Sequence, residues 1–272
     1  MCDFCVTQAV KERMLSRRDV FKAAPMALAA GTATVMAAPP SLASGHAQVV
    51  DLTHPVTPEF PTYFGTPGIE IDPEFNFADD GFNVNMLRVR EHTGTHIDAP
   101  LHFSADGQAV GEIPVANLVC PLCVVHIHEK AADDADAVVT PDDLAAWIAK
   151  NGPIPDGACV AFHSGWEEHI GTPKYRGADD AGVQHYPGFH LEAAQMLMEE
   201  TGAIGLAADT LSVDIGASTT FDTHYAWLPT NRWALENVAN LAEVPEAGAT
   251  LIVGAPTHAG GSGGPARILA LV

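Results

Sequence analysis

Basic residues are scarce in this sequence of 272 residues. Lysine and arginine together number 13 against 34 aspartates and glutamates, which gives a formal net charge of -21 at pH 7. A chain this acidic repels the phosphates of nucleic acids and of anionic lipids, so neither is expected as a partner. The charge does not restrict a small substrate, because a metal ion can reverse the field at a local site.

Long apolar runs are missing after residue 47. No stretch approaches the roughly 18 apolar residues of a membrane span, so no stable membrane anchor is expected once the first 47 residues are removed. Internal repeats and low-complexity linkers are also missing. Because 47% of the residues are hydrophobic and 17% are charged, the composition is that of a globular protein. We therefore expect residues 48–272 to form a single catalytic domain.

Residues 1–47 resemble a twin-arginine export signal. Arg17 and Arg18 precede an alanine-rich apolar segment, and a small-residue site at 45–47 follows it. Such segments are removed before the fold matters. The alternative is an alanine-rich N-terminal helix or anchor. Twin-arginine export carries folded proteins, which suits an enzyme already loaded with metal, so a periplasmic or other extracytoplasmic location is expected.

The few cysteines are not expected to form a disulfide framework. Cys2 and Cys5 fall in the presumed signal. Cys120 and Cys123 have thioredoxin-like spacing, but their apolar surroundings predict a strand, in which they would be about 10 Å apart against a disulfide limit of about 7 Å. We expect buried free thiols, with Cys159 packed in another strand.

Alternating strand and helix patterns predict an α/β fold. Thr140 has the features of a helix N-cap, with Pro141 at the first helical position and Gly152 past the end. Alternation of this kind favours βαβ crossovers and some parallel pairing. The predicted helices cover residues 140–151 and 191–202, and the predicted strands cover residues 83–90, 118–128, 158–163, 203–208, 250–255 and 267–272.

Three other polar features have simple structural interpretations. The GGSGG segment at 260–264 lacks the lysine of a phosphate-binding loop, so it predicts a backbone turn. Asp209 and Asp214 follow a predicted strand and are expected to hydrogen-bond nearby loops. Glu167 and Glu168 are expected to be solvated at the surface.

The segment HTGTHIDAPLH, residues 92–102, crowds His92, His96, Asp98 and His102 into eleven positions. A helix is disfavoured by its β-branched residues, a central glycine and a proline. In an extended chain these even-numbered groups share one face. Because a straight strand of this length covers about 33 Å, the backbone must curl for the groups to meet at one ion. Residues 94 and 100, a glycine and a proline, are where a curl costs least.

Imidazole and carboxylate ligands without thiolate suit Zn²⁺ or Mn²⁺. An ion held by His92, His96 and Asp98 would leave open positions for water. His102 is better placed off the metal, where its imidazole could act as a general acid or base.

The eleven-residue segment resembles the H-x-G-T-H-x-D-x-P-x-H signature of the cyclase family, which contains bacterial kynurenine formamidases and isatin hydrolases. AFHSGW, the block from YPGFH to LSVD, and GGSGGPARILAL resemble further parts of that family. The resemblance implies a swivelling β/β/α fold in which helices pack around a β core with a mixed sheet. It also implies a homodimer or larger homo-oligomer.

The resemblance further implies ligands at His224 and Glu236, twelve residues apart. A straight helix over this span would be about 18 Å long, so both could reach one site only if the helix breaks, and Pro229 lies between them. By the same carry-over, Asp98 and Glu236 would bridge two ions, with His92 and His96 on one and His224 on the other. Whether one or two Zn²⁺ or Mn²⁺ ions bind stays open.

The resemblance implies hydrolysis of a small aromatic or cyclic substrate, either an aryl formamide or a cyclic amide. Tyr63, Phe103 and Trp166 are candidates to line its pocket. The formamidases have a tryptophan before Pro-Gly where this chain has Tyr63-Phe64-Gly65, so its substrate preference can differ. The alternatives are a lactone hydrolase, an Fe(II) oxygenase using His96, Asp98 and His224, and a non-catalytic protein that binds aromatic ligands.

Overall fold

The computed structural model describes residues 48–272, so the proposed export signal lies outside the described residues. The chain divides into two compact units, of which one contains residues 70–88 and the other contains residues 48–69 and 89–272. No helix within the described residues is long and apolar enough to span a membrane.

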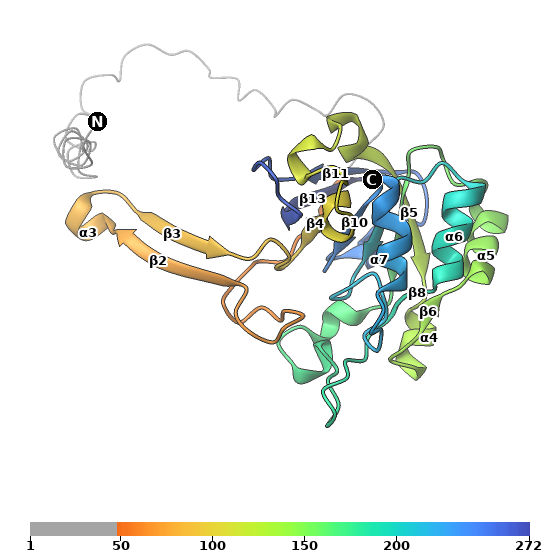
Figure 1. Cartoon of the computed structure of the whole chain (residues 1–272), viewed down its shortest axis with the longest axis horizontal. Coiled ribbons are helices and arrows are strands. Elements are labelled where there is room, and N and C mark those ends of the chain that lie inside the picture. Colours follow the sequence, from red (N-terminus) through yellow and green to blue (C-terminus); the bar gives the residue numbers. More distant parts are fainter. Residues whose placement is uncertain (1–47) are drawn as a thin grey trace, which may run out of the picture. The chain divides into compact units, whose positions relative to one another are not determined.

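The larger unit is built on a mixed sheet, part of which is labelled in Figure 1. Its nine strands have the order β1-β13-β11-β5-β7-β9-β10-β4-β12. Two further strands, β6 (Val138–Val139) and β8 (Gly188–Phe189), pair with each other. The strands of the large sheet are β1 (Val49–Asp51), β4 (His96–Asp98), β5 (Val119–His126), β7 (Cys159–His163), β9 (Gly205–Ala208), β10 (Trp233–Glu236), β11 (Ala249–Gly254), β12 (Gly263–Pro265) and β13 (Arg267–Leu271).

The centre of the sheet is parallel and its flanks are antiparallel. Strands β5, β7, β9 and β10 run parallel to one another, as the strand and helix alternation predicted. The strands β4, β12, β11, β13 and β1 pair antiparallel. The expected α/β fold with a mixed sheet is thereby confirmed.

Each face of the sheet is covered by an apolar cluster. Since successive side chains of a strand point to opposite sides, one strand contributes to both clusters. On β5, Leu122 and Val124 join one apolar cluster with β10, β11 and β13. Cys123 and Val125 join a second cluster, which the helices cover. This arrangement explains why β5 is an almost continuous apolar run. The thiols of Cys120, Cys123 and Cys159 are free and buried in these strands, as predicted.

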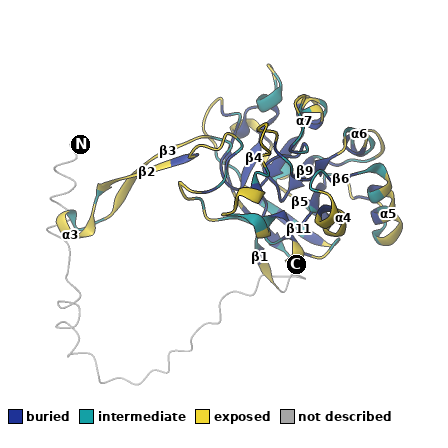
Figure 2. Cartoon of the chain, turned by 90° about the horizontal axis from the view of Figure 1, so that it is seen from below, coloured by how far each residue is buried: buried dark blue, intermediate teal, exposed yellow. Residues whose placement is uncertain are grey.

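Helices α5 and α6 lie side by side against the sheet, and buried residues concentrate in the strands beneath them (Figures 1 and 2). Thr140 caps α5 with its side chain and Pro141 opens the helix, as predicted. The α-helices of this unit are α4 (His128–Asp133), α5 (Pro141–Asn151), α6 (Leu191–Glu200) and α7 (Asp222–Trp227). Its short 3-10 helices are η1 (Pro100–Phe103), η2 (Val110–Glu112), η3 (Val115–Leu118), η4 (Trp166–His169), η5 (Pro173–Tyr175), η6 (Leu228–Thr230) and η7 (Leu241–Glu243).

The smaller unit is a hairpin made of β2 (Ile69–Phe75), α3 (Phe77–Asp80) and β3 (Val84–Val89). The predicted strand at 84–89 is present, but all six of its residues are exposed (Figure 2). Strand β3 pairs with β2 in a separate sheet.

Candidate metal centre

The backbone curl predicted inside HTGTHIDAPLH occurs at both expected residues. Gly94 adopts the left-handed conformation with φ of 63°, and a Cβ there would lie 2.3 Å from the side chain of Val56. Only glycine therefore fits this turn. Asn237 holds the turn by donating from its side-chain amide to the Gly94 carbonyl over 2.9 Å. Pro100 then begins the 3-10 helix η1 and ends the extended segment.

Strand β4 brings the first ligand candidates onto the sheet. His96 and Asp98 share one face of β4, while Ile97 between them packs in the core. The antiparallel pairing of β4 with β10 places Glu236 directly beside His96. On its other edge β4 pairs with the glycine-rich β12, where a Cβ on Gly263 would lie 2.8 Å from the ring of His92.

His224 reaches the same point because the helix breaks before Glu236, as the twelve-residue separation required. Helix α7 ends at Trp227, η6 contains Pro229, and the chain returns as strand β10. Both His224 and Glu236 are buried, at 3% and 6% exposure. They are therefore neither a surface imidazole nor a solvated carboxylate.

Two carboxylates face two imidazoles at the centre of the site. The Nε2 atom of His96 lies 3.3 Å from Asp98 Oδ1 and 3.3 Å from Glu236 Oε2. The Nε2 atom of His224 lies 3.5 Å from Asp98 Oδ2 and 3.3 Å from Glu236 Oε1. Each carboxylate therefore lies close to both rings, with a different oxygen near each ring.

The Nδ1 atoms of His96 and His224 make hydrogen bonds outside the centre, which leaves their Nε2 atoms free for a cation. His96 donates from Nδ1 to the Gly94 carbonyl over 2.8 Å. His224 lies 2.5 Å from Asp214 Oδ2 through its Nδ1. Within the described residues, His96 Nε2 and Asp98 Oδ2 are buried without a hydrogen-bond partner. Such orphaned atoms are costly unless an ion satisfies them, so the donor set fits a divalent metal.

His92 completes one side of this centre. Its Nδ1 lies 2.6 Å from Asp98 Oδ1 and its Nε2 lies 2.9 Å from the Ser262 hydroxyl. The Ser262 hydroxyl donates its hydrogen bond to Glu91 Oε2 over 2.5 Å. The hydroxyl therefore accepts from His92 Nε2, and the Nδ1 side of the ring faces Asp98.

The electrostatics of the centre demand positive charge. Burial alone raises the pKa of Asp98, but the positive charge of the neighbouring His96 and the nearby rings of His224 and His92 hold it well below its usual value. Burial also lowers the pKa of His96, yet Asp98 and Glu236 together raise it to about 10. Buried carboxylates in such an enclosure require a cationic partner.

Two ligand groups meet in these residues and share Asp98. One group is His92, His96 and Asp98, and the other is Asp98, His224 and Glu236, with the candidate ligand atoms of each group within 4.8 Å of one another. This arrangement is compatible with one ion or with two. The geometry brings together all five residues that the sequence analysis named as ligands.

Asp214 belongs to the site, although the sequence analysis interpreted it only as a loop hydrogen bond. Its carboxylate accepts from the backbone amides of Thr223 and His224 over 2.8 and 3.2 Å and also contacts the His224 ring. It therefore caps α7 and fixes the orientation of the ligand ring. The sequence offers only the spacing of ten residues to His224 as a signal.

Replacing Asp214 by asparagine should weaken metal binding about 10- to 100-fold, because it removes the charge that orients the His224 ring. Titration of metal-free protein with Mn²⁺ measures the effect, with circular dichroism to show that the fold is retained. Asp222→Asn is a matched control, because Asp222 lies in the helix that carries His224 but is exposed. Equal affinities in the two variants would contradict this role.

A cavity opens above the centre. Its empty volume, including the open mouth, is about 680 Å³, within the range of small-molecule sites. Tyr63, Phe64, Phe103 and Phe221 form aromatic walls, and the Phe103 ring lies 4.5 Å from that of His224. Phe221 adopts the left-handed conformation with φ of 53°, a strain of about 1–3 kcal/mol that is typical of functional sites.

His102 lines the same cavity. Its ring stacks on His92 with centroids 3.7 Å apart, and its burial lowers its pKa to about 4. Among residues 48–272, neither ring nitrogen of His102 has a hydrogen-bond partner. His102 is outside both ligand groups and lies beside the centre.

Three expectations require correction. Trp166 does not line the cavity, because it is buried at 2% exposure and donates its indole N–H to the Tyr175 carbonyl. Glu167 is not simply solvated, because it accepts from the Asn240 amide over 2.8 Å. The GGSGG segment is more than a turn, since part of it forms β12 and Ser262 contacts His92. By contrast, Asp209 bonds the loop at 164–165, as expected.

The chain is similar to isatin hydrolases and to a kynurenine formamidase. The sequence is 32% identical to isatin hydrolase from Roseibium aggregatum over 250 residues, covering 85% of this chain and 94% of the relative. It is 27% identical to kynurenine formamidase from Bordetella petrii over 189 residues, covering 69% and 81%. The structure is similar to isatin hydrolase A from Labrenzia aggregata bound to benzyl benzoate, with a TM-score of 0.78, 31% identity, and coverage of 83% and 93%.

The family assignment follows from the extent of these matches. The sequence model of the Cyclase family matches residues 50–215, which include the HTGTHIDAPLH segment and Asp214. The relatives match over most of their own length and carry the same fold. The chain belongs to the Cyclase family.

Proposed function

We propose that this chain is a metal-dependent hydrolase that opens a small cyclic amide of the isatin type. The observation that carries the proposal is the convergence of Asp98, Glu236, His96 and His224 at the floor of an aromatic-walled cavity. The similarity to isatin hydrolases over nearly their whole length supports a cyclic amide over other substrates.

His92, His96, Asp98, His224 and Glu236 would hold the metal. Nitrogen and oxygen donors without thiolate suit Zn²⁺ or Mn²⁺, as one ion or two. When bound, the ion supplies a Lewis acid that polarises the amide carbonyl and makes water more acidic. Asp214 and Ser262 hold two of the ligand rings in place, so the donor set is organised before substrate arrives.

His102 would carry the proton that hydrolysis requires. Adding water across the amide places a hydroxyl on the carbonyl carbon and a proton on the nitrogen, while the C–N bond breaks. The imidazole of His102 faces the cavity and is unpaired within the described residues, so it can accept a proton from water and return it to the leaving nitrogen.

The aromatic walls would position a planar substrate. Tyr63 and Phe221 lie 5.9 Å apart, and Phe221 and Phe103 lie 5.6 Å apart, measured between ring centroids. The Tyr63 carbonyl accepts from Arg176 and Gln184, both over 3.1 Å, which fixes the loop that carries this wall. A fused ring can therefore stack between side chains whose positions are already set.

The proposal is tested by presenting isatin, N-formylkynurenine and an aromatic lactone to the purified chain under anaerobic conditions. With Mn²⁺ or Zn²⁺ added, we expect isatin to be opened with the highest kcat/KM, and a chelator to abolish the reaction reversibly. Preference for N-formylkynurenine would favour the second candidate, an aryl formamidase, which the kynurenine formamidase relative supports. Turnover that requires O₂ and Fe(II) would overturn hydrolysis.

We further propose that the chain forms a homo-oligomer and is exported to the periplasm. Met86 and Leu87 of the hairpin are 58% and 54% exposed, and an isolated two-stranded hairpin is only marginally stable. Both features support a homodimer or larger homo-oligomer in which another copy covers the hairpin. The arginine pair at 17–18 supports export to the periplasm.

A further inference from the structure

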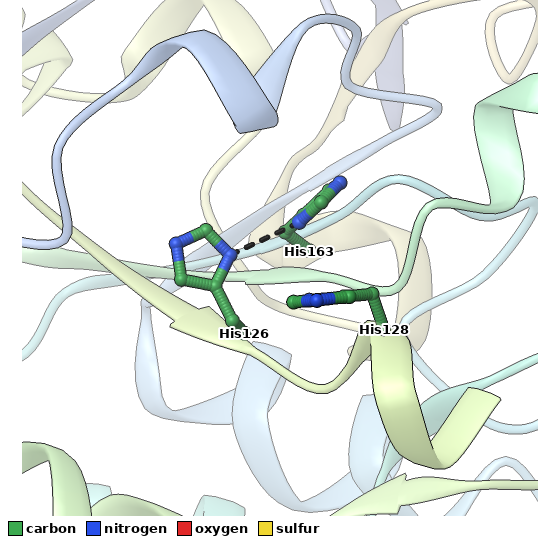
Figure 3. A group of neighbouring side chains, drawn as sticks. All are labelled: His126, His128 and His163. Carbon is green, nitrogen blue, oxygen red and sulfur yellow. Dashed lines mark hydrogen bonds between the residues drawn. The ribbon is translucent and has the colours of Figure 1, made fainter. Parts of the chain in front are cut away.

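Three histidines gather at a second place in the sheet, on strands that carry none of the ligands described above. His126 ends β5, His163 ends β7, and the parallel register pairs these two residues directly. His128 begins α4 two residues later. Figure 3 shows the three rings turned toward one another.

The backbone that carries these rings is held by hydrogen bonds. The amide of Ile127 donates to the carbonyl of His163 over 2.9 Å, and Ile127 itself is buried in the core. His126 and His128 flank this anchored residue. Because the side chains come from a strand end, a helix start and a neighbouring strand end, their spacing is set by regular structure.

The ring nitrogens lie close enough together to share one ion. The Nδ1 atoms of His126 and His163 are hydrogen-bonded over 3.0 Å, and a candidate nitrogen of each of the three rings lies within 4.8 Å of the others. In a tetrahedral site with Zn–N bonds of about 2.0–2.1 Å, neighbouring nitrogens are about 3.3–3.4 Å apart. Small ring rotations therefore bring all three into range.

The ligand type limits the ion. Three imidazoles without a carboxylate favour Zn²⁺, Ni²⁺ or Cu²⁺ over Mg²⁺ or Ca²⁺, which prefer oxygen. His126 and His128 are exposed and His163 is partly buried, so an ion could enter from solvent and keep a water at its open position.

We propose that His126, His128 and His163 form a second divalent metal site that binds Zn²⁺ or a similar transition metal. This site joins the ends of β5 and β7 to the start of α4. It lies on different strands from the Cyclase site, with β9 between β7 and β10 in the sheet order. A bound ion here stabilises the fold and takes no part in hydrolysis.

The test is a metal count on the tag-free full chain. Wild type, His126→Gln/His128→Gln and His190→Gln are dialysed against Zn²⁺ and analysed by mass spectrometry. We expect the double variant to hold one zinc fewer per chain than wild type, with isatin hydrolysis unchanged. His190→Gln should match wild type, because His190 is exposed and outside the three-histidine group. All other sites in the chain cancel in this difference.

A second measurement separates this site from the catalytic one. The double substitution is repeated in an Asp98→Ala background, where the loss of one zinc should persist. Zn²⁺ should also raise the Tm of wild type more than that of the double variant. Equal zinc counts in wild type and double variant, in either background, would overturn the proposal without affecting the proposed hydrolase.

Discussion

Replacing Asp98 by alanine should lower kcat/KM by about a thousandfold or more and should release the bound metal. Asp98 is the residue that the two ligand groups share, and its oxygens face His92, His96 and His224. Its loss removes a ligand from every possible ion and leaves the remaining donors too few to hold one tightly. Loss of an ion that contributes several kcal/mol of charge stabilisation corresponds to this fall in rate.

Metal content and kcat/KM for isatin measure this expectation together. Asp142→Ala is a suitable control, because Asp142 is an exposed carboxylate in the first turn of α5. An Asp98→Ala protein that is folded, keeps its full metal content and turns over at the wild-type rate would show that the centre is assigned to the wrong residues.

Replacing His102 by alanine should lower kcat by about 10²- to 10⁴-fold while the protein keeps its metal, the range expected for loss of a general acid or base. His102 stacks on His92, a candidate ligand, and lies outside both ligand groups. The fall should appear in kcat more than in KM, since the proton is needed in the transition state and not for binding.

His169→Ala is the matched control for this substitution, because His169 lies in η4 and outside the cavity. A His102→Ala protein with normal kcat would remove the assigned proton transfer. Loss of metal from that variant would instead identify His102 as a ligand.

The sequence predicted the part of the site within residues 92–102 well because its geometry is local. The even spacing of the groups in residues 92–102, with Gly94 and Pro100 among them, required a curled extended segment, and both residues bend the chain as expected. Glu236 and His224 could be named only through the family resemblance. Their meeting depends on the pairing of β4 with β10, residues far apart in sequence.

The failures have physical causes of the same kind. Asp214 comes after the same strand as Asp209, and only the folding of the 214–222 loop brings its carboxylate to Nδ1 of His224. Trp166 is an aromatic residue of the kind that often lines pockets, yet it is buried in the core, where its indole N–H donates to the Tyr175 carbonyl. The alternation in 84–89 predicted the strand correctly, but alternation cannot say whether the apolar face meets this chain's core or another surface.

The floor and the walls of the cavity come from different kinds of backbone. The floor is fixed by strand pairing between β4 and β10, whereas Tyr63, Phe64 and Phe221 extend from loops. Loops tolerate exchange and insertion better than paired strands do. Selection, or a protein engineer, can therefore reshape which molecule enters without disturbing the reactive groups, so one chemistry can diversify across many substrates by changes confined to the rim.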